Sequence, residues 1–210
     1  LRGEMALGCR RMNIHVIRHA TQAFAEVIKS EGESACARGI AICFDCRINS
    51  ERFAHEAAGV MAANGIHVRI FDALRPTPEL SFAVKHYGTT AGLNITASHN
   101  PKEYNGYKAY WDDGAQVLAP HDTAIIDEVN KVTVEDIKFK GNKDLIQIIG
   151  EDVDKVYLDK VHTLSIDPEV IKRQKDLSIV YTPLHGAGRT LIPASLKEWG
   201  FENVHCVPEQ

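Results

Sequence analysis

The 210-residue sequence lacks the features that mark several large classes of protein. It has no stretch approaching the roughly 18 uninterrupted apolar residues that a membrane-spanning helix needs. Its first residues, 1–4 (LRGE), contain no apolar segment of the kind that a signal peptide carries. The net charge is −4 and no basic run is present, so nucleic acid is not an expected partner. We therefore expect a cytoplasmic protein that binds neither a membrane nor nucleic acid.

Cysteine is scarce as well. Five cysteines are an odd and sparse number, which is typical of a reducing compartment and not of a disulfide-stapled domain. Cys43 and Cys46 form a C-x-x-C pair, but no second pair completes a zinc site, and we interpret the pair as structural. His15 and His19 stand four residues apart on an expected helix. No third ligand follows them at motif spacing, so we interpret them in the same way.

What the sequence does contain is an alternation of helix and strand patterns. Its 44% of hydrophobic residues against 25% charged residues excludes a disordered chain. Apolar residues at helical spacing predict helices, and short continuous apolar runs predict strands buried on both faces. In the first hundred residues these are helices near 11–29, 50–64 and 77–88, and strands at 39–45, 66–71 and 91–96. The alternation predicts an α/β domain with a mixed, largely parallel sheet layered between helices.

The remainder of the chain predicts the end of this domain and the start of another. The expected elements are a strand-like segment at 104–118, a helix from Pro120 to Val132, a surface excursion at 133–150, a helix at 151–165, and a strand, helix and strand between 177 and 207. The last three repeat the strand–helix–strand rhythm of the first domain. We therefore expect one domain over residues 1–150, then a linker helix and the first part of a second, similar α/β domain over 151–210.

The residues from Thr96 to Pro101 (TASHNP) follow a predicted buried strand. In α/β sheets, functional groups collect in the crevice at the carboxyl ends of the strands. A serine beside a histidine, with Lys108 ten residues further on, suits an activated nucleophile or a hydroxyl that carries a phosphoryl group. Residue types alone, however, more often indicate an ordinary polar turn, in which serine and asparagine hydrogen-bond the backbone.

The order of these residues is more specific than their types. The string TASHNP, followed by NGYK at 105–108, resembles the active-site signature of the α-D-phosphohexomutases, the phosphoglucomutase/phosphomannomutase family. Residues 1–3 (LRG) resemble the end of that family's G-T-x-G-L-R-G motif, and residues 45–47 (DCR) stand where the family has D-x-R. The resemblance implies the fold of phosphohexomutase domain I.

Two later segments extend the resemblance over nearly the whole chain. The stretch from Trp111 to Asp122 (WDDGAQVLAPHD) is most similar to the branch of the family that contains phosphoglucomutase-2 and phosphopentomutase. The stretch from Tyr181 to Gly188 (YTPLHGAG) is similar to the opening strand and loop of the family's second domain.

The resemblance implies roles for six residues of this chain. The catalytic group consists of the phosphoryl carrier Ser98, the general base and acid Lys108, and two residues beside them, His99 and Arg2, of which Arg2 would help to hold the phosphoserine charge. The group that binds substrate or phosphate consists of Asn100, which would also shape the loop, and Arg47.

The resemblance also implies a magnesium ion and a sugar bisphosphate. In the family, Mg²⁺ is bound by the phosphoserine, here Ser98, and by three aspartates of a D-G-D-x-D-R loop that these 210 residues do not contain. We therefore expect the remaining metal ligands, and the residues that choose the sugar, to lie beyond Gln210. A sugar 1,6-bisphosphate would act as the activator. Phosphoryl transfer depends mainly on positioning and charge neutralisation, so cations near the serine matter more than a strong nucleophile.

These implications favour a phosphohexomutase that interconverts the 1-phosphate and 6-phosphate of glucose or mannose through a phosphoserine and a sugar bisphosphate. A phosphopentomutase of the same family is the nearest alternative, because the WDDGAQ stretch resembles both branches. A non-catalytic homologue that only binds phosphosugars is the alternative from a different class. The combination of Ser98, His99 and Lys108 argues against it, since a binding protein has no need for these three groups together.

We predict that residues 1–210 alone will not interconvert hexose 1- and 6-phosphates. The phosphoserine and the substrate phosphate each bring close to two negative charges. The family neutralises these charges with the aspartate-bound Mg²⁺ and with a phosphate-binding domain, and without them the substrate is not positioned. An assay of the purified fragment with glucose 1-phosphate checks this. Mg²⁺-dependent activity that Ser98→Ala abolishes would contradict the prediction.

Overall fold

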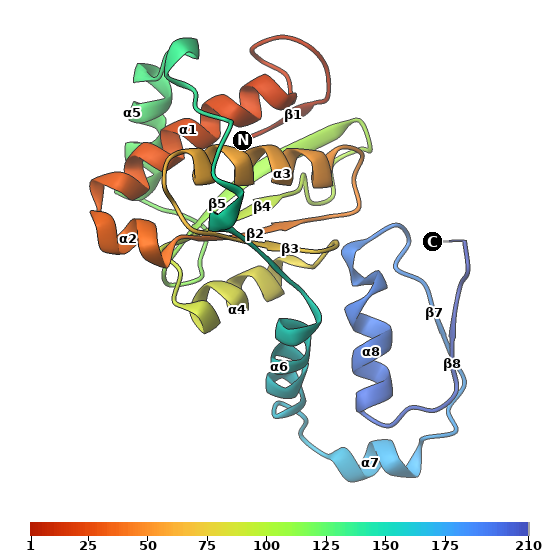
Figure 1. The fold of residues 1–210 in the computed structure, drawn as a ribbon. Coiled ribbons are helices and arrows are strands. Elements are labelled where there is room, and N and C mark those ends of the chain that lie inside the picture. Colours follow the sequence, from red (N-terminus) through yellow and green to blue (C-terminus); the bar gives the residue numbers. More distant parts are fainter. Residues whose placement is uncertain (210) are drawn as a thin grey trace.

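A six-stranded sheet forms the centre of the computed structural model, which describes residues 1–209 (Figure 1). Its strands, in spatial order, are β1 (Arg2–Glu4), β5 (Tyr104–Trp111), β4 (Ala91–Ile95), β2 (Ile40–Phe44), β3 (Val68–Phe71) and β6 (Ile146–Ile149). Strands β4, β2, β3 and β6 are parallel to one another, and β5 lies antiparallel between β1 and β4. The predicted mixed, largely parallel sheet is confirmed.

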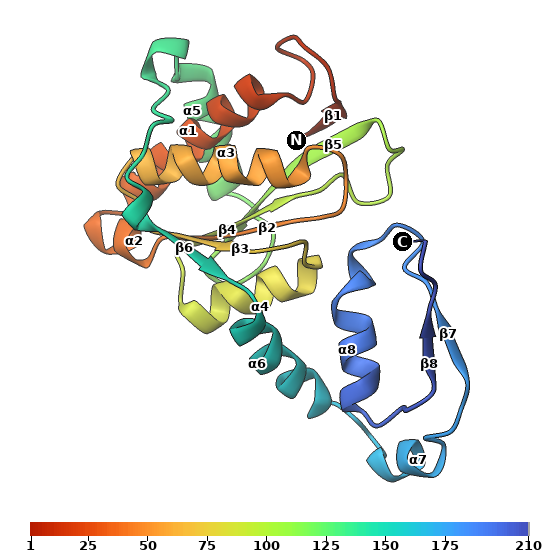
Figure 2. The same cartoon turned by 45° about the vertical axis from the view of Figure 1, so that its right-hand side comes forward.

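Helices cover both faces of this sheet (Figures 1 and 2). One face carries α1 (Ile14–Ser30), α3 (Ser50–Ala63) and α5 (His121–Lys131), and the other carries α4 (Thr77–Tyr87), with α6 (Glu151–His162) packed against α4. A short helix, α2 (Glu33–Arg38), joins α1 to β2.

The central strand β2 shows how the sequence produces these layers. All five of its residues are buried. Ile40 and Ile42 pack into the core under α1 and α3, whereas Ala41 and Cys43 pack into the smaller core against α4. Because successive side chains of a strand point to opposite faces, a continuous apolar run is needed wherever both faces are covered.

Helix α1 begins where the predicted apolar stripe begins. The Asn13 side chain accepts hydrogen bonds from the backbone N–H groups of His15 and Val16, both at 3.1 Å, and so caps the helix. The stripe that follows, including Ile17 and Phe24, is fully buried. The helix predicted near 11–29 is therefore confirmed.

The segment 133–150 departs from its predicted form as a surface excursion. Its first part contains only two short 3₁₀ turns, at Val134–Asp136 and Lys143–Leu145, but its end forms β6, which pairs in parallel with β3. Only Ile149 of this edge strand is buried, and Ile148 is 56% exposed. The run LIQII at 145–149 is itself apolar, but the lysine-rich stretch before it favours a surface segment.

Residues 177–209, called the second unit below, follow the predicted strand–helix–strand order. Strands β7 (Ile179–Tyr181) and β8 (Val204–Cys206) pair in parallel, and α8 (Leu191–Glu198) connects them after a 3₁₀ turn at Ala187–Arg189. A further short helix, α7 (Pro168–Arg173), precedes β7. Within residues 1–209, no helix has the length and apolar character that crossing a membrane requires.

The predicted domain boundaries stay predictions. The division at residue 150 falls between β6 and α6. The other boundary, Gln210, ends the predicted first part of the second domain and lies outside the described residues.

A buried charged cluster fastens α6 to the first sheet. Arg75, at the end of the loop between β3 and α4, is 4% exposed. Its guanidinium donates two hydrogen bonds of 2.7 Å to the carboxylate of Asp154 on α6 and one of 3.2 Å to Asp72. The carboxyl group of Glu79, with no exposed surface, lies 3.8 Å from Arg75 Nε.

Burial, with the nearby Asp154 carboxylate as the next cause, raises the pKa of Glu79 to about 9. The folded protein therefore holds a proton that an unfolded glutamate releases near its ordinary pKa of 4.5. The stability that this proton contributes is complete below about pH 4.5. It is lost progressively as the pH rises toward 9.

We predict that Glu79→Gln stabilises the full-length protein more at pH 8 than at pH 5. The neutral glutamine needs no proton, so its folded state escapes the loss that the buried carboxyl suffers with rising pH. Melting temperatures at the two pH values test this, with Glu128→Gln on α5 as the control. An equal effect of Glu79→Gln at both pH values would contradict the assigned protonation of Glu79.

Candidate active site

The TASHNP segment forms a loop at the carboxyl end of β4, between β4 and the antiparallel β5. Ser98 is exposed at the tip of this loop and has a φ angle of 58°, which is in the left-handed region. Its backbone N–H donates to the Thr96 hydroxyl at 2.9 Å. A non-glycine residue in this region costs energy and persists where the surroundings hold it, often at functional sites.

Arg47 holds the serine loop in shape. The two terminal amino groups of its guanidinium donate four hydrogen bonds to backbone carbonyls. These belong to Ser98 at 2.8 Å, Asn100 at 2.5 Å, Pro101 at 2.8 Å and Tyr104 at 3.1 Å. The Pro101 carbonyl also accepts from the Tyr104 backbone N–H at 3.0 Å, and the guanidinium adds donors for the carbonyl groups of the loop.

Arg47 is itself oriented by Asp45. The Arg47 Nε lies 3.4 Å from the Asp45 carboxylate, and the Arg47 backbone N–H donates to the same carboxylate at 3.0 Å. With its terminal N–H groups directed at the loop and Nε directed at Asp45, Arg47 has no donor left for a substrate phosphate. In this structure Arg47 positions the serine loop, and the phosphate-binding role expected for it stays a prediction.

The start of β5 is locked to the same region. Asn105 is fully buried and donates to the Ile48 carbonyl at 3.1 Å and to the Ser50 hydroxyl at 2.9 Å. Next to it, Gly106 lies so close to the Thr96 carbonyl that a β-carbon would collide with it. These contacts explain why the NGYK string has asparagine at position 105 and glycine at position 106.

With Arg47, five of the six expected site residues meet at the serine loop. The Ser98 hydroxyl lies 3.4 Å from Nδ1 of His99, and Asn100 accepts a hydrogen bond of 3.2 Å from the Arg2 guanidinium. Arg2 reaches the loop because β1 pairs with β5, placing Arg2 opposite Gly106. The loop, the histidine and one cation therefore lie together at one edge of the sheet.

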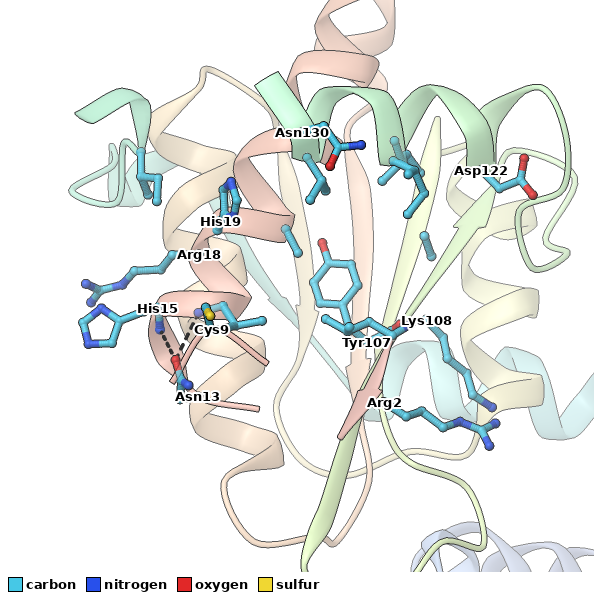
Figure 3. A pocket seen from close by; sticks show the side chains of 18 of the residues that line it. Arg2, Cys9, Asn13, His15, Arg18, His19, Tyr107, Lys108, Asp122 and Asn130 are labelled. Atoms are coloured by element: carbon cyan, nitrogen blue, oxygen red, sulfur yellow. Dashed lines mark hydrogen bonds between the residues drawn. The ribbon is translucent and has the colours of Figure 1, made fainter. Parts of the chain in front are cut away.

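Lys108 stands on β5 beside Arg2. Figure 3 shows the two side chains next to each other, while the neighbouring Tyr107 points the opposite way. Arg2, Tyr107 and Lys108 all line a cavity of about 1000 Å³ that extends between α1 and α5. Partial burial, with the Arg2 cation as the next cause, lowers the pKa of the Lys108 ammonium, although Asp45 opposes this shift. A lysine with a lowered pKa releases its proton more easily, as a general base must.

A cleft of about 690 Å³ extends from the serine loop to the second unit. It is lined by the serine loop, the 45–48 loop, the start of α4 and residues 184–188. The Cys46 thiol donates a hydrogen bond to the His185 carbonyl across the cleft. Leu184 and His185 have positive φ angles of 45° and 65°. The sequence did not predict that α4 and residues 184–188 line the serine cleft. It placed residues 181–188 in another domain.

Residues 1–209 do not build a metal site by themselves. Among them, no three His, Cys, Asp or Glu side chains come together as a set that could hold a metal ion. Ser98, once phosphorylated, supplies oxygen ligands, but the described residues do not complete the coordination that Mg²⁺ requires. The expectation that the other ligands lie beyond Gln210 stays a prediction.

Comparison with known proteins agrees with this arrangement. Residues 1–136 match the family model of the phosphoglucomutase/phosphomannomutase alpha/beta/alpha domain I. Over the whole chain, the sequence is 35% identical to a phosphoglucomutase of Staphylococcus haemolyticus and 33% identical to a phosphopentomutase of Homo sapiens. The chain spans 38% and 36% of the lengths of these relatives.

A solved structure shows the same fold. A phosphoglucomutase/phosphomannomutase family protein from Burkholderia thailandensis superimposes with a TM-score of 0.71 at 19% identity. The match covers 99% of this chain and 42% of that protein. At this identity the likeness concerns the fold alone.

We predict that Arg47→Lys loosens the serine loop. A lysine ammonium has three donors and no planar fork, so it cannot serve the carbonyls that Arg47 serves. Unpaired loop carbonyls should lower the free energy of unfolding by about 1–3 kcal/mol. Backbone amide exchange over residues 96–104 should become faster, whereas exchange in α1 should not change.

The matched control for this variant is Arg52→Lys, an exposed arginine on the neighbouring helix α3. Both proteins are followed by hydrogen exchange and mass spectrometry. Unchanged exchange of the 96–104 peptide in Arg47→Lys would show that Arg47 does not hold the loop.

Proposed function

Since the chain belongs to the phosphoglucomutase/phosphomannomutase family, we propose that the full-length protein is a phosphosugar mutase. It interconverts sugar 1-phosphate and 6-phosphate through a phosphoserine at Ser98 and a sugar bisphosphate intermediate. The observation that carries this proposal is the exposed Ser98, held in the left-handed region by an Arg47-supported loop beside the cations of Arg2 and Lys108.

In the proposed first step, phosphorylated Ser98 donates its phosphoryl group to a free hydroxyl of the sugar monophosphate. The bond between Ser98 Oγ and phosphorus breaks and a bond from the sugar oxygen to phosphorus forms. The proton of the sugar hydroxyl passes to neutral Lys108, and protonated His99 gives a proton to the leaving Ser98 Oγ. The resulting sugar bisphosphate turns around. It then returns its other phosphoryl group to Ser98, whose hydroxyl proton passes back to His99, and Lys108 gives its proton to the sugar hydroxyl that is released.

The surrounding side chains have electrostatic tasks in this scheme. Arg2 partly neutralises the phosphoserine, and Asn100 orients Arg2 through the hydrogen bond to its guanidinium. His99, next to the Ser98 hydroxyl, donates to or accepts from that oxygen when it is unphosphorylated. We propose that Mg²⁺ in the full-length protein adds further charge neutralisation at the phosphoserine, with its other ligands beyond Gln210.

The substrate of the proposed mutase is a hexose phosphate of glucose or mannose, and the similarity to a phosphoglucomutase at 35% identity supports it. The alternative is a phosphopentomutase, which would act on a pentose 1-phosphate and 5-phosphate because a pentose has no sixth carbon. The similarity to a phosphopentomutase at 33% identity supports this alternative. Assays of the full-length protein with the 1-phosphates of glucose, mannose and ribose, primed with the matching bisphosphate, decide between them. No turnover of any of the three would favour a non-catalytic phosphosugar-binding protein.

We predict that Lys108→Ala in the full-length protein lowers kcat by about 10²–10⁴-fold, the range for loss of a general acid/base. The fold should change little, because Lys108 is only partly buried and its strand is paired on both sides. Steady-state kinetics on the preferred sugar phosphate test this, with Lys131→Ala at the end of α5 as the control. A kcat close to that of the unmodified protein would assign the proton transfer to another group, with His99 next in line.

A further inference from the structure

The buried cluster of Arg75, Glu79 and Asp154 has no part in the chemistry proposed above, yet one of its members reaches the serine cleft. Arg75 lines this cleft from the side opposite the serine loop. Its guanidinium forms the bidentate bond to Asp154, and NH1 donates to the Leu74 carbonyl at 3.0 Å. Its remaining interactions reach Asp72 and Glu79.

Glu79 and Asp154 both lie at the Arg75 guanidinium, and a direct attraction between their two carboxyl groups requires a shared proton. No N–H or O–H group of the described residues donates a hydrogen bond to either oxygen of Glu79, although its side chain has no exposed surface. The neighbour that affects Glu79 most is the carboxylate of Asp154. Two carboxyl groups can form a hydrogen bond when one of them carries a proton, and Glu79 is the one that is fully buried. Glu79 is therefore the donor and Asp154 the acceptor.

The remaining charges around Glu79 support this assignment. Asp72 lies on the loop before α4, Tyr157 on α6 and Cys43 on β2, and each of them either is negative or becomes negative when it loses a proton. Arg75 is the only cation in this set. With Asp154 and Asp72 already charged beside it, an ionised Glu79 would place a third carboxylate around a single guanidinium.

This proton-sharing group fixes the position of α6. Asp154 lies in the first turn of that helix, 79 residues along the chain from Arg75. Two further contacts hold α6 against α4: the rings of Phe82 and Tyr157 pack edge-to-face at 5.3 Å, and the Tyr87 hydroxyl donates to Asp152 at 3.2 Å. The contact at Asp154 is the most enclosed of these, because both of its partners, Arg75 and Glu79, are buried.

Helix α6 in turn supports the part of the second unit that faces the cleft. It packs against α8, and the rings of His162 and Trp199 meet 6.2 Å apart at the far end of the two helices. Figures 1 and 2 both show α6 between α4 and α8. The chain enters α8 directly from residues 184–188, the loop that lines the serine cleft.

We propose that Arg75, Glu79 and Asp154 form a proton-dependent clamp. This clamp holds α6, and through α6 the 184–188 loop, at the serine cleft. Sugar phosphate then binds tightly only while Glu79 and Asp154 share a proton. The inference rests on the proposed mutase function for its kinetic consequence. The three residues are positioning residues, because they act on the substrate through the placement of the loop.

The clamp predicts a specific effect of alkaline pH on substrate binding. With a pKa of about 9, Glu79 keeps its proton in about one-tenth of the molecules at pH 10. When only a fraction of molecules is competent to bind, the apparent dissociation constant rises by the inverse of that fraction. KM of the full-length protein for its sugar phosphate should therefore rise about tenfold between pH 7.5 and pH 10.

The Glu79→Gln variant distinguishes a rise in KM caused by Glu79 from one caused by the titration of any other group. Glutamine has nearly the same shape, and its amide N–H can donate to Asp154 at any pH, as the protonated Glu79 does. In this variant the KM should be close to that of the unmodified protein at pH 7.5 and should change less than twofold up to pH 10. The alkaline change in kcat that belongs to Lys108 should persist. Glu128→Gln, outside the cluster, should keep the full tenfold rise in KM.

A second readout tests the clamp without any activity. When the clamp opens, residues 163–167 between α6 and α7 should become accessible to a protease. In the unmodified full-length protein, cleavage there should be several-fold faster at pH 10 than at pH 7.5. In Glu79→Gln the two rates should be equal. Rates are normalised to those of Glu128→Gln at each pH. If no sugar phosphate is turned over, the proposed function is wrong. The cleavage rates still show whether loss of the Glu79 proton releases α6. An alkaline rise in KM or in cleavage that Glu79→Gln retains would overturn the clamp.

Discussion

The contacts between the Arg47 guanidinium and the backbone of the serine loop are the constraint on which the rest of the site depends. A carbonyl group left unpaired away from water costs about 1–3 kcal/mol. The planar guanidinium of Arg47 donates to four carbonyl groups between Ser98 and Tyr104, and Asp45 holds it in the orientation that this requires. This support allows Ser98 to keep a left-handed backbone and to present its hydroxyl to the cleft.

Two kinds of electrostatic environment lie around the serine loop. Arg2 and Lys108 line the cavity that extends between α1 and α5 and are exposed or partly buried, so in the proposed reaction their charge is available to a phosphate. On the side of α4, the charge of Arg75 is enclosed and directed at carboxyl groups. Phosphoryl transfer requires both arrangements, because cations must meet the reacting phosphate while the surrounding segments keep the substrate in line with the serine.

The sequence predicted the elements that are apolar on two faces or amphipathic over several turns, such as the strand at Ile40–Phe44 and the helix at Ile14–Ser30. It did not predict β6, because the short apolar run that forms this strand follows a lysine-rich, irregular stretch. At the site, the motif located Arg47 beside the serine loop but could not indicate that its donors face backbone carbonyls. The pairing of Arg75 with Asp154 was not predictable at all, because it depends on how α6 packs against α4 and joins residues that no motif connects.

The central claim is that Ser98 transfers a phosphoryl group to and from sugar phosphates. The most direct test incubates the full-length protein with a sugar 1,6-bisphosphate that carries labelled phosphate and then digests it. The account predicts label on Ser98 within the 96–101 segment, and release of that label into a sugar bisphosphate when unlabelled sugar monophosphate is added. A Ser98 that stays unlabelled, or that keeps its label in the presence of sugar monophosphate, would contradict the account.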